Sequence, residues 1–344
     1  MTAELAEQPE DWTEPGAYPV VAGVHRVPLP LPLTGLRAVN VYVVDGPEGP
    51  TLVDSGWAGA DAGLLTEGLR RLGHDLSDVA RIAVTHSHHD HYTQALAIRA
   101  THGTPVLLGR GERHSVAAMA RRPDSEAAQA GLLVRAGAPE LAAEMALRSK
   151  AEALADDAPW GEPDIWLDDG QALPVGGRAL EVRATPGHTR GHIVLRDSGI
   201  GALFAGDHVL PHITPSIGYE WAPEPAPLQS YLDSLRLVRD LPDTLLLPAH
   251  GPVTRSVHTR IDELLDHHEE RLAAALAQVR SGAETACAVA AGLPWTRRRK
   301  RLEDLETEHA ALAVLEIAAH LDVLVAAEQL VCAEVDGVRR YAVA

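Results

Sequence analysis

The densest group of metal-binding side chains in the sequence lies at residues 85–91, THSHHDH, which hold four histidines and one aspartate. The segment leading into it, VARIAVTH (79–86), is short, apolar and rich in β-branched residues, which predicts a buried strand. The cluster therefore begins where a core strand ends, and loops at such places often carry function. Burying so many polar groups is costly unless a partner satisfies them, and a divalent cation is such a partner.

Other segments of the chain show the same order of features, a strand followed at once by an imidazole or a carboxylate. They are TLVDSG (51–56), TPGHTRGH (185–192), FAGDH (204–208) and LLPAHG (246–251). The ends of strands in a layered α/β fold converge on one edge, where binding sites form. One histidine after a strand says little, but five such motifs in order predict a shared metal centre.

These motifs carry a family resemblance. The spacing His86-x-His88-x-Asp90-His91, with His188, Asp207 and His250 further on, resembles the metallo-β-lactamase superfamily in its glyoxalase II-like, binuclear form. The resemblance covers about residues 20–255. It implies an α/β fold, an αβ/βα four-layer sandwich with the metals at one edge.

The resemblance also implies a role for each matching residue. One metal would be held by His86, His88 and His188, the other by Asp90, His91 and His250, with Asp207 bridging the two. Asp54 matches an aspartate that orients the site from behind the ligands, and His192 matches another supporting position. Asp90, Asp207 and His192 are the expected catalytic residues.

The ligand types indicate which metals and which chemistry to expect. Imidazole nitrogen with carboxylate oxygen suits two zinc ions, and also iron or manganese. The resemblance implies that a water bridging the metals loses a proton and attacks a carbonyl carbon as hydroxide. A Ser–His–Asp mechanism is not supported, because the sequence has no G-x-S-x-G and Ser87 sits among ligands.

The sequence departs from the family pattern in two places. The family often continues DH-x-G-G after the first motif, whereas Thr93 and Gln94 stand here. A related branch with a single iron, the persulfide dioxygenases, tolerates threonine near this position, which keeps a mononuclear iron oxygenase as an alternative. Ala249, in PAHG, replaces a common glycine. His89 is not expected to be a ligand.

Composition shifts divide the chain into parts. They are an N-terminal arm (1–19), a metallo-β-lactamase domain (20–256) with a helical insertion (about 110–160), and a small winged-helix-like domain (257–344). The last part has two helical segments and a hairpin expected to turn at Asp336-Gly337. The prolines of GVHRVPLPLPLTG (23–35) predict an edge strand or an extended segment.

The insertion lies between two metal-binding motifs, so it could cover the site as a lid. A lid would offer apolar walls for an acyl chain from Leu132, Leu133, Val134, Met145 and Leu147. The alternative is that these side chains pack against the sandwich or against a second subunit, as in a homodimer. Tyr219 and Trp221 are candidates for the wall of the substrate cleft, with simple packing as their alternative.

Composition excludes several classes of protein. Cys287 and Cys332 are the only cysteines and lie far apart, which excludes a disulfide scaffold. The acidic N-terminus has no apolar core of a signal peptide, and no uninterrupted membrane span is present, so we expect a cytoplasmic protein. A net charge of −18 argues against nucleic-acid binding. The basic run RRRKR (297–301) is the exception. It is either a solvated loop or a binding site for the phosphates of coenzyme A or RNA.

The best-supported function at this level is a metal-dependent hydrolase of a small acyl compound. A thioester of glutathione, coenzyme A or a carrier protein is the favoured substrate. The alternatives are an endoribonuclease of the winged-helix subgroup, a lactone or β-lactam hydrolase, and a regulator on an inactive scaffold. The complete ligand set opposes the last of these.

Overall fold

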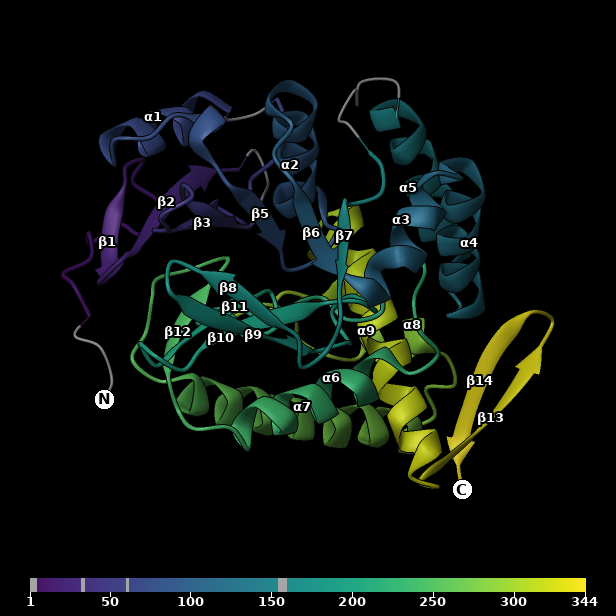
Figure 1. Cartoon of the computed structure of the whole chain (residues 1–344). Coiled ribbons are helices and arrows are strands. Elements are labelled where there is room, and N and C mark those ends of the chain that lie inside the picture. The colour runs from purple at the N-terminus through teal and green to yellow at the C-terminus, as the bar shows by residue number, and fades with distance from the viewer. Residues whose placement is uncertain (1–4, 32–34, 60–61, 154–159) are drawn as a thin grey trace.

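The computed structural model describes residues 5–31, 35–59, 62–153 and 160–344. Two β-sheets face each other at its centre (Figure 1). The larger sheet has the order β1-β2-β3-β4-β5-β6-β7, with strands Tyr18–Val21, Val24–Pro30, Ala38–Val44, Thr51–Val53, Arg81–Val84, Val106–Gly109 and Ile165–Leu167. The smaller has the order β12-β11-β10-β9-β8, with β8 to β12 at Ala172–Val175, Arg178–Ala184, Ile193–Asp197, Ala202–Gly206 and Leu245–Pro248.

Helices cover the outer face of each sheet. In Figure 1, α1 (Ala62–Arg71) and α2 (His89–His102) lie over the larger sheet, and α6 (Pro227–Arg239) and α7 (Val257–Arg280) lie over the smaller one. One apolar cluster fills the space between the sheets, and two others lie beneath the helices. This is the αβ/βα four-layer sandwich expected from the sequence.

The chain direction of the central strands explains why the motifs meet. β4, β5 and β6 are parallel neighbours, and so are β11 and β12 in the other sheet. Residues that follow parallel strands leave the sheet at the same edge. The motifs that follow β4, β5, β11 and β12 therefore lie at one end of the sandwich.

The proline-rich segment forms a strand with neighbours on both sides, so of the two alternatives the edge strand was wrong. Residues 32–34 of this segment lie outside the described residues. β2 pairs with β1 through residues 24–26 and with β3 along its whole length. Pro28 and Pro30 lie beyond the short β1, on the part of β2 that is paired only with β3. The prolines thus sit where no donor is needed on the open side, which is the physical reason behind the expectation.

The described part of the N-terminal arm is tied to the larger sheet. Ala6 donates its N–H to the carbonyl of Val20, and the buried Arg26 donates to the carbonyl of Trp12 at 2.6 Å. Residues 1–4 of the expected arm lie outside the described residues.

Three helices occupy the chain between β6 and β7: α3 (Arg113–Met119), α4 (Arg122–Arg135) and α5 (Pro139–Ala153). Leu133 is buried among the C-terminal helices, and Leu132 and Met145 pack against the same cluster. Val134 and Leu147 are exposed, so these five residues do not form one apolar wall. The packing partner of Leu132, Leu133 and Met145 is the C-terminal part of the same chain. Residues 154–159 of the expected insertion lie outside the described residues.

The C-terminal part consists of α7, α8 (Ala286–Ala291), α9 (Thr307–Ala326) and a hairpin of β13 (Leu330–Val335) and β14 (Val338–Val343), which projects from the body in Figure 1. Asp336 and Gly337 form its turn with φ of 51° and 77°, as expected. Within the described residues, α9 alone is long and apolar enough to cross a membrane. It packs against α5, α6, α7 and α8, and 56% of its most apolar 18-residue stretch is buried, as in the core helix of a folded domain.

The basic run at 297–301 is an exposed turn between α8 and α9. Trp295 and Lys300 bridge its two ends, and the guanidinium of Arg271 lies 3.9 Å from the centre of the Trp295 ring. Arg297 donates to the carbonyl of His212 at 2.7 Å. This arginine therefore fastens the loop that follows β11.

Candidate metal centre

The seven side chains expected to bind metal converge at one edge of the sandwich. They form two groups, one with His86, His88, His188 and Asp207 and the other with Asp90, His91 and His250. Within each group the potential ligand atoms lie within 4.8 Å of one another. They come from the loops after β5, β9, β11 and β12 and, for Asp90 and His91, from the first turn of α2.

The first group presents three imidazole nitrogens and one carboxylate oxygen. Nδ1 of His88 lies 3.0 Å from Nε2 of His86 and 3.1 Å from Nε2 of His188. Oδ2 of Asp207 lies 4.0 Å and 3.5 Å from the same two Nε2 atoms. The edge of a zinc tetrahedron with bonds of 2.0–2.1 Å is about 3.4 Å, so these separations suit one cation.

The second group uses the other oxygen of the same aspartate. Oδ1 of Asp207 lies 3.3 Å from Nε2 of His250 and 3.7 Å from Nε2 of His91. Oδ2 of Asp90 lies 3.4 Å and 3.7 Å from those two nitrogens. Asp207 therefore faces both groups, one oxygen toward each, as a bridging ligand does.

The hydrogen bonding of these atoms shows that the residues fit a cation. Four buried ligand atoms have no hydrogen-bond partner among the described residues: Asp90 Oδ2, His91 Nε2, Asp207 Oδ1 and His250 Nε2. Buried polar atoms are rarely left unsatisfied, and each costs about 1–3 kcal/mol when they are. A bound metal ion would satisfy all four at once.

The remaining ring nitrogens are held by the fold, which fixes the tautomers. Nδ1 of His188 donates to the Ser216 carbonyl at 2.8 Å, and Nδ1 of His250 donates to the Ala38 carbonyl at 2.7 Å. Each ring therefore turns an unprotonated Nε2 toward the centre. Such outer contacts orient ligands and raise metal affinity.

Asp54 supports two ligands from behind, as the resemblance implied. Its Oδ2 lies 3.0 Å from Nδ1 of His91. Its carboxylate also accepts from the backbone N–H and the hydroxyl of Thr85, and that hydroxyl lies 3.1 Å from Nδ1 of His86. Asp54 has φ of 61°, a left-handed conformation uncommon outside glycine, and such strain often occurs at functional sites.

His192 lies behind the bridging aspartate and not at its open side. Its Nε2 accepts the backbone N–H of Asp207 at 3.1 Å, and its Nδ1 lies 2.9 Å from the Thr185 hydroxyl. The ring is buried, with both nitrogens engaged. His192 is therefore a positioning residue, which corrects the expectation of a directly catalytic role.

Burial and neighbouring charges set the protonation of the centre. Burial lowers the pKa of His86, His88 and His188, which keeps these imidazoles neutral and able to bind metal. Burial lowers the pKa of the supporting His192 as well. Burial also opposes protonation of His91, but Asp90, Asp54 and Asp207 outweigh it and raise the pKa of His91 to about 10. The anionic side of the centre is thus the second group, where a cation is best accommodated.

Two supporting residues were missed in the sequence. Glu112 is fully buried and accepts from the hydroxyls of Ser87, which lies between two ligands, and Thr189, which follows His188. A β-carbon at Gly191 would lie 1.9 Å from the backbone nitrogen of Glu112, so this close approach requires glycine. The Ser87 and Thr189 hydroxyls beside ligands were the available signal, but nothing in the sequence links them to position 112.

Asn40 is the second residue that was missed. Its Nδ2 donates to the carbonyls of Pro248 and Gly251, which flank His250, at 2.9 and 2.8 Å. Its Oδ1 accepts from the guanidinium of Arg26 at 3.0 Å. The only hint of this contact in the sequence was the polar Asn40 within an otherwise apolar strand, directly before VYVVDG.

Other residues singled out in the sequence are not members of the two ligand groups. Tyr219 packs against the cluster of C-terminal helices, and Trp221 is half-buried. His89 is outside both ligand groups, and its ring lies between Trp57 and Trp160. Thr93, one of the family departures, accepts from the N–H of Ala58 and donates to the carbonyl of His89. It thereby links the loop after β4 to the first turn of α2.

Comparisons with known proteins agree with this geometry. A family model described as the metallo-beta-lactamase superfamily matches residues 34–250. The structure is similar to a metallo-beta-lactamase family protein of Thermus thermophilus, with a TM-score of 0.79 and 28% identity over 94% of this chain and 99% of that one. A beta-lactamase domain protein from Burkholderia ambifaria gives a TM-score of 0.79 and 30% identity over 95% and 94%.

Curated relatives match over shorter stretches. The lactamase-like protein aptB of Emericella nidulans is 27% identical over 69% of this chain and 59% of its own length. The beta-lactamase-like protein 2 homolog of Caenorhabditis elegans is 36% identical over 31% of this chain. This chain spans about a third of the length of that relative, 33%.

Proposed function

Because the chain belongs to the metallo-beta-lactamase superfamily, we propose that it is a two-metal hydrolase that cleaves a small thioester. The observation that carries the proposal is the pair of ligand groups that share Asp207, one oxygen facing each. Two divalent cations, such as zinc, would supply a polarised carbonyl and a hydroxide nucleophile at neutral pH.

The residues of the chain hold and orient this chemistry. Asp207 spans both groups, while Asp54 and Glu112 fix the ligand loops from behind. His88 is the most exposed of the ligands, which leaves the first group open on that side. A substrate carbonyl is expected to approach there.

The leaving group distinguishes a thioester from an amide or a lactam. A thiolate leaves without being protonated first because a thiol has a pKa of about 8.5, whereas an amine leaving group requires a proton. The acyl donors we propose are thioesters of glutathione, coenzyme A or a carrier protein.

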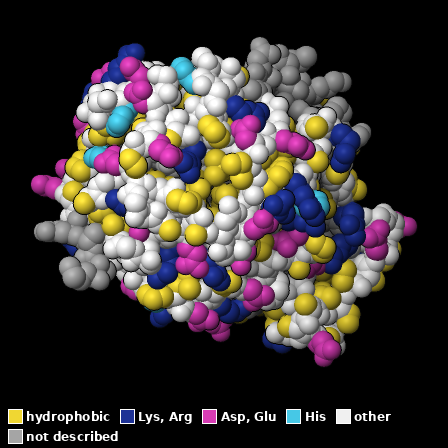
Figure 2. Space-filling model, in the orientation of Figure 1, with side chains coloured by type: hydrophobic (Ala, Val, Ile, Leu, Met, Phe, Trp, Pro, Cys, Tyr) yellow, Lys and Arg dark blue, Asp and Glu magenta, His cyan; other side chains and the backbone are white. Residues whose placement is uncertain are grey.

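An RNA substrate is the second candidate from the sequence, and the structure gives it little support. Acidic and basic side chains are interspersed on the face shown in Figure 2, within a chain of net charge −18. Arg297, from the basic run, is engaged with a backbone carbonyl. A continuous basic surface is the usual mark of RNA binding.

The test is release of free thiol from a panel of acyl-coenzyme A and acyl-glutathione thioesters, with metal-loaded and chelated protein compared. We expect release only from the loaded protein, restored when zinc is returned. A metal-replete protein that hydrolyses none of the panel would refute the proposal. The same preparation, assayed with RNA and with lactones, shows which alternative replaces it.

A further inference from the structure

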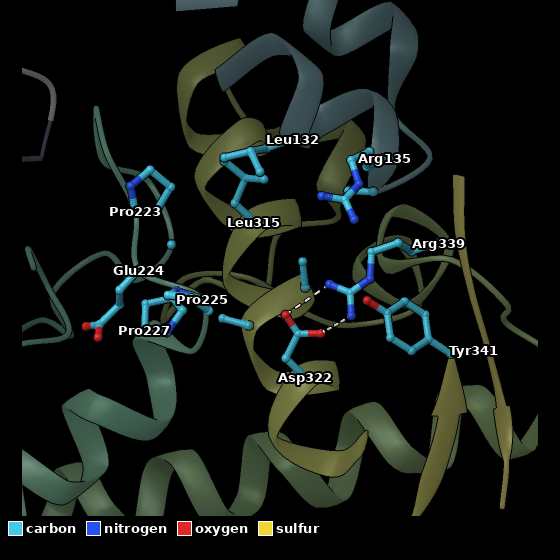
Figure 3. A pocket seen from close by; sticks show the side chains of 14 residues that line it. Leu132, Arg135, Pro223, Glu224, Pro225, Pro227, Leu315, Asp322, Arg339 and Tyr341 are labelled. Carbon is cyan, nitrogen blue, oxygen red and sulfur yellow. Dashed lines mark hydrogen bonds and ion pairs between the residues drawn. The ribbon is translucent and has the colours of Figure 1, made fainter. Parts of the chain in front are cut away.

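A cavity of about 260 Å³ lies on the C-terminal side of the molecule, between α4, α9, β14 and the segment 218–227 (Figure 3). Its apolar lining includes Leu132 on α4, Leu315 and Ala318 on α9, and Pro223. The volume suits a ligand of fragment size. Small-molecule sites are typically apolar hollows with a few placed polar groups.

Two guanidinium groups line this cavity. In Figure 3, Arg135 of α4 lies above Arg339 of β14, both on the side away from the prolines. Arg339 makes a paired contact with the carboxylate of Asp322 and lies over the ring of Tyr341. That contact neutralises one of the two cations.

The second cation is less firmly paired. Arg135 contacts Glu334 at 3.1 Å, but both side chains are about half exposed (51% each). Exposed pairs of this kind contribute little, so Arg135 can turn toward a ligand at small cost. Glu224 lies on the far side of the prolines in Figure 3 and accepts from the hydroxyl of Ser230, away from the arginines.

We propose that this cavity binds a monocarboxylate carried on a short aliphatic chain. Asp322 already pairs with Arg339, and a ligand carboxylate would replace Glu334 as the partner of Arg135. That exchange swaps one single negative charge for another, which a carboxylate matches better than a doubly charged phosphate. Arginine binds carboxylates through two parallel hydrogen bonds. The aliphatic chain would lie against Leu132, Leu315 and Ala318.

The cavity shares a backbone segment with the metal centre. Ser216, whose carbonyl holds Nδ1 of His188, lies two residues before Gly218, which lines the cavity. Gly218 has φ of 87°, and a β-carbon there would lie 3.2 Å from the Leu315 carbonyl oxygen. A ligand in the cavity would therefore lie against the same backbone segment that contacts a metal ligand.

The test is binding of hexanoate, measured by calorimetry and by saturation-transfer NMR, with 1-hexanol and acetate as the matched probes. We expect a dissociation constant of about 1 mM for hexanoate, with both partial probes about 10-fold weaker. Arg135→Gln should weaken hexanoate by about 10-fold, because it removes a charge-assisted contact. The matched control is Arg340→Gln. Arg340 lies on the hairpin and forms a similar exposed pair with Glu284, but it does not line the cavity.

Carboxylates also bind metal ions, so each titration is run on metal-loaded and chelated protein. Binding that persists after chelation and falls in Arg135→Gln supports the proposal. Binding that vanishes on chelation, equals that of 1-hexanol, or is unchanged in Arg135→Gln overturns it. Arg339→Gln is a second variant. If it does not fold, the Arg135→Gln titrations still decide the test.

Two sources of this ligand share the same chemistry: a free carboxylic acid, and the far end of an acyl substrate. Where the proposed thioesterase activity is present, competitive inhibition by hexanoate indicates the substrate's own end, and noncompetitive inhibition indicates a separate acid. The binding titrations use no turnover. Failure of the thioesterase proposal therefore leaves them interpretable.

Discussion

Asp207 is the residue on which both ligand groups depend, since each of its oxygens faces a different set of histidines. Asp207→Asn should lower the bound metal from two ions toward one and reduce turnover by about 10²–10³-fold, the usual effect of removing one electrostatic element. Elemental analysis and thiol release measure the two effects. Asp168→Asn, at a surface pair with Arg110, is the control. A variant that keeps two metals and full activity would contradict the bridging role.

Glu112 supports ligands without touching the centre. Glu112→Ala should weaken zinc affinity by about 10–100-fold, because the loops of Ser87 and Thr189 lose their common acceptor. Competition with a chromophoric chelator measures the affinity. Glu220→Gln, a change at a buried carboxylate that contacts Ser115 and the Arg190 N–H instead, should leave the affinity close to wild type. Equal losses in both variants would indicate a general packing effect.

Glu220 also makes stability depend on pH. Burial, then the nearby Glu112, raise the pKa of Glu220 to about 8 from 4.5. The folded state therefore keeps a proton that the unfolded state loses, so stability falls as pH rises from 4.5 to about 8. Glu220→Gln should flatten this fall by up to about 1.4 kcal/mol per pH unit, measured by urea unfolding across that range. An unchanged slope would place the proton elsewhere.

At the same scale, the sequence identified the seven residues that converge and the supporting Asp54 and His192, but missed Glu112 and Asn40. His86, His88, His188 and His250 follow predictable strands, so their convergence can be inferred from the order of strands. Glu112 and Asn40 reach the site through contacts between distant segments, of which a single sequence holds no record. Tyr219 was a candidate for the cleft because it follows Asp207 by a short distance, and its partly buried side chain packs against the cluster of C-terminal helices, the packing that was its alternative.

Among the elements, α7 and α9 meet through a buried pair of imidazoles. Nδ1 of His268 lies 3.2 Å from Nε2 of His320, whose own Nδ1 donates to the Glu316 carbonyl. Burial lowers the pKa of His268 to about 2 and that of His320 to about 4. The unfolded chain gains protons on these histidines below their ordinary pKa of 6.5, whereas the folded chain does not. The free energy of unfolding is therefore highest above pH 6.5 and falls as the pH drops toward 4.

His268→Gln should make this acid loss shallower by up to about 1.4 kcal/mol per pH unit, because one buried group no longer titrates. Urea unfolding of chelated protein between pH 4 and 7 measures the slope, so that metal binding does not enter. His102→Gln, at an exposed position at the end of α2, should leave the slope unchanged. Identical slopes in all three proteins would show that other groups govern acid unfolding.

Elements also show why the packing partner of the insertion was not predicted. Leu132, Leu133 and Met145 have the helical spacing of an apolar face, which predicts burial but not the partner. The partner proved to be α9, nearly two hundred residues away on average and far beyond any local pattern. Strand order, in contrast, follows neighbours in the sequence for the larger sheet, so the sandwich was predictable.

For the molecule as a whole, residues 257–344 share cores with the rest of the chain. Val257, Ile261 and Leu264 of α7 are buried in the cluster beneath the smaller sheet. Losing the burial of three such side chains forfeits about 5–9 kcal/mol of stabilisation, comparable with the entire stability of a typical domain. A chain ending at residue 256 should therefore aggregate, as measured by soluble yield and gel filtration, whereas the full chain should unfold in one transition. A soluble, cooperatively folded 1–256 would contradict this.

Arg260, ten residues beyond the last metal ligand, donates to the carbonyls of Leu210 and Ile213 and so fastens the loop after β11. During synthesis this arginine leaves the ribosome after every ligand has emerged. A nascent chain thus exposes its histidines before the loop that carries Asp207 is secured. Metal loading should be a late event in the life of the polypeptide, timed by the release of its C-terminal helices.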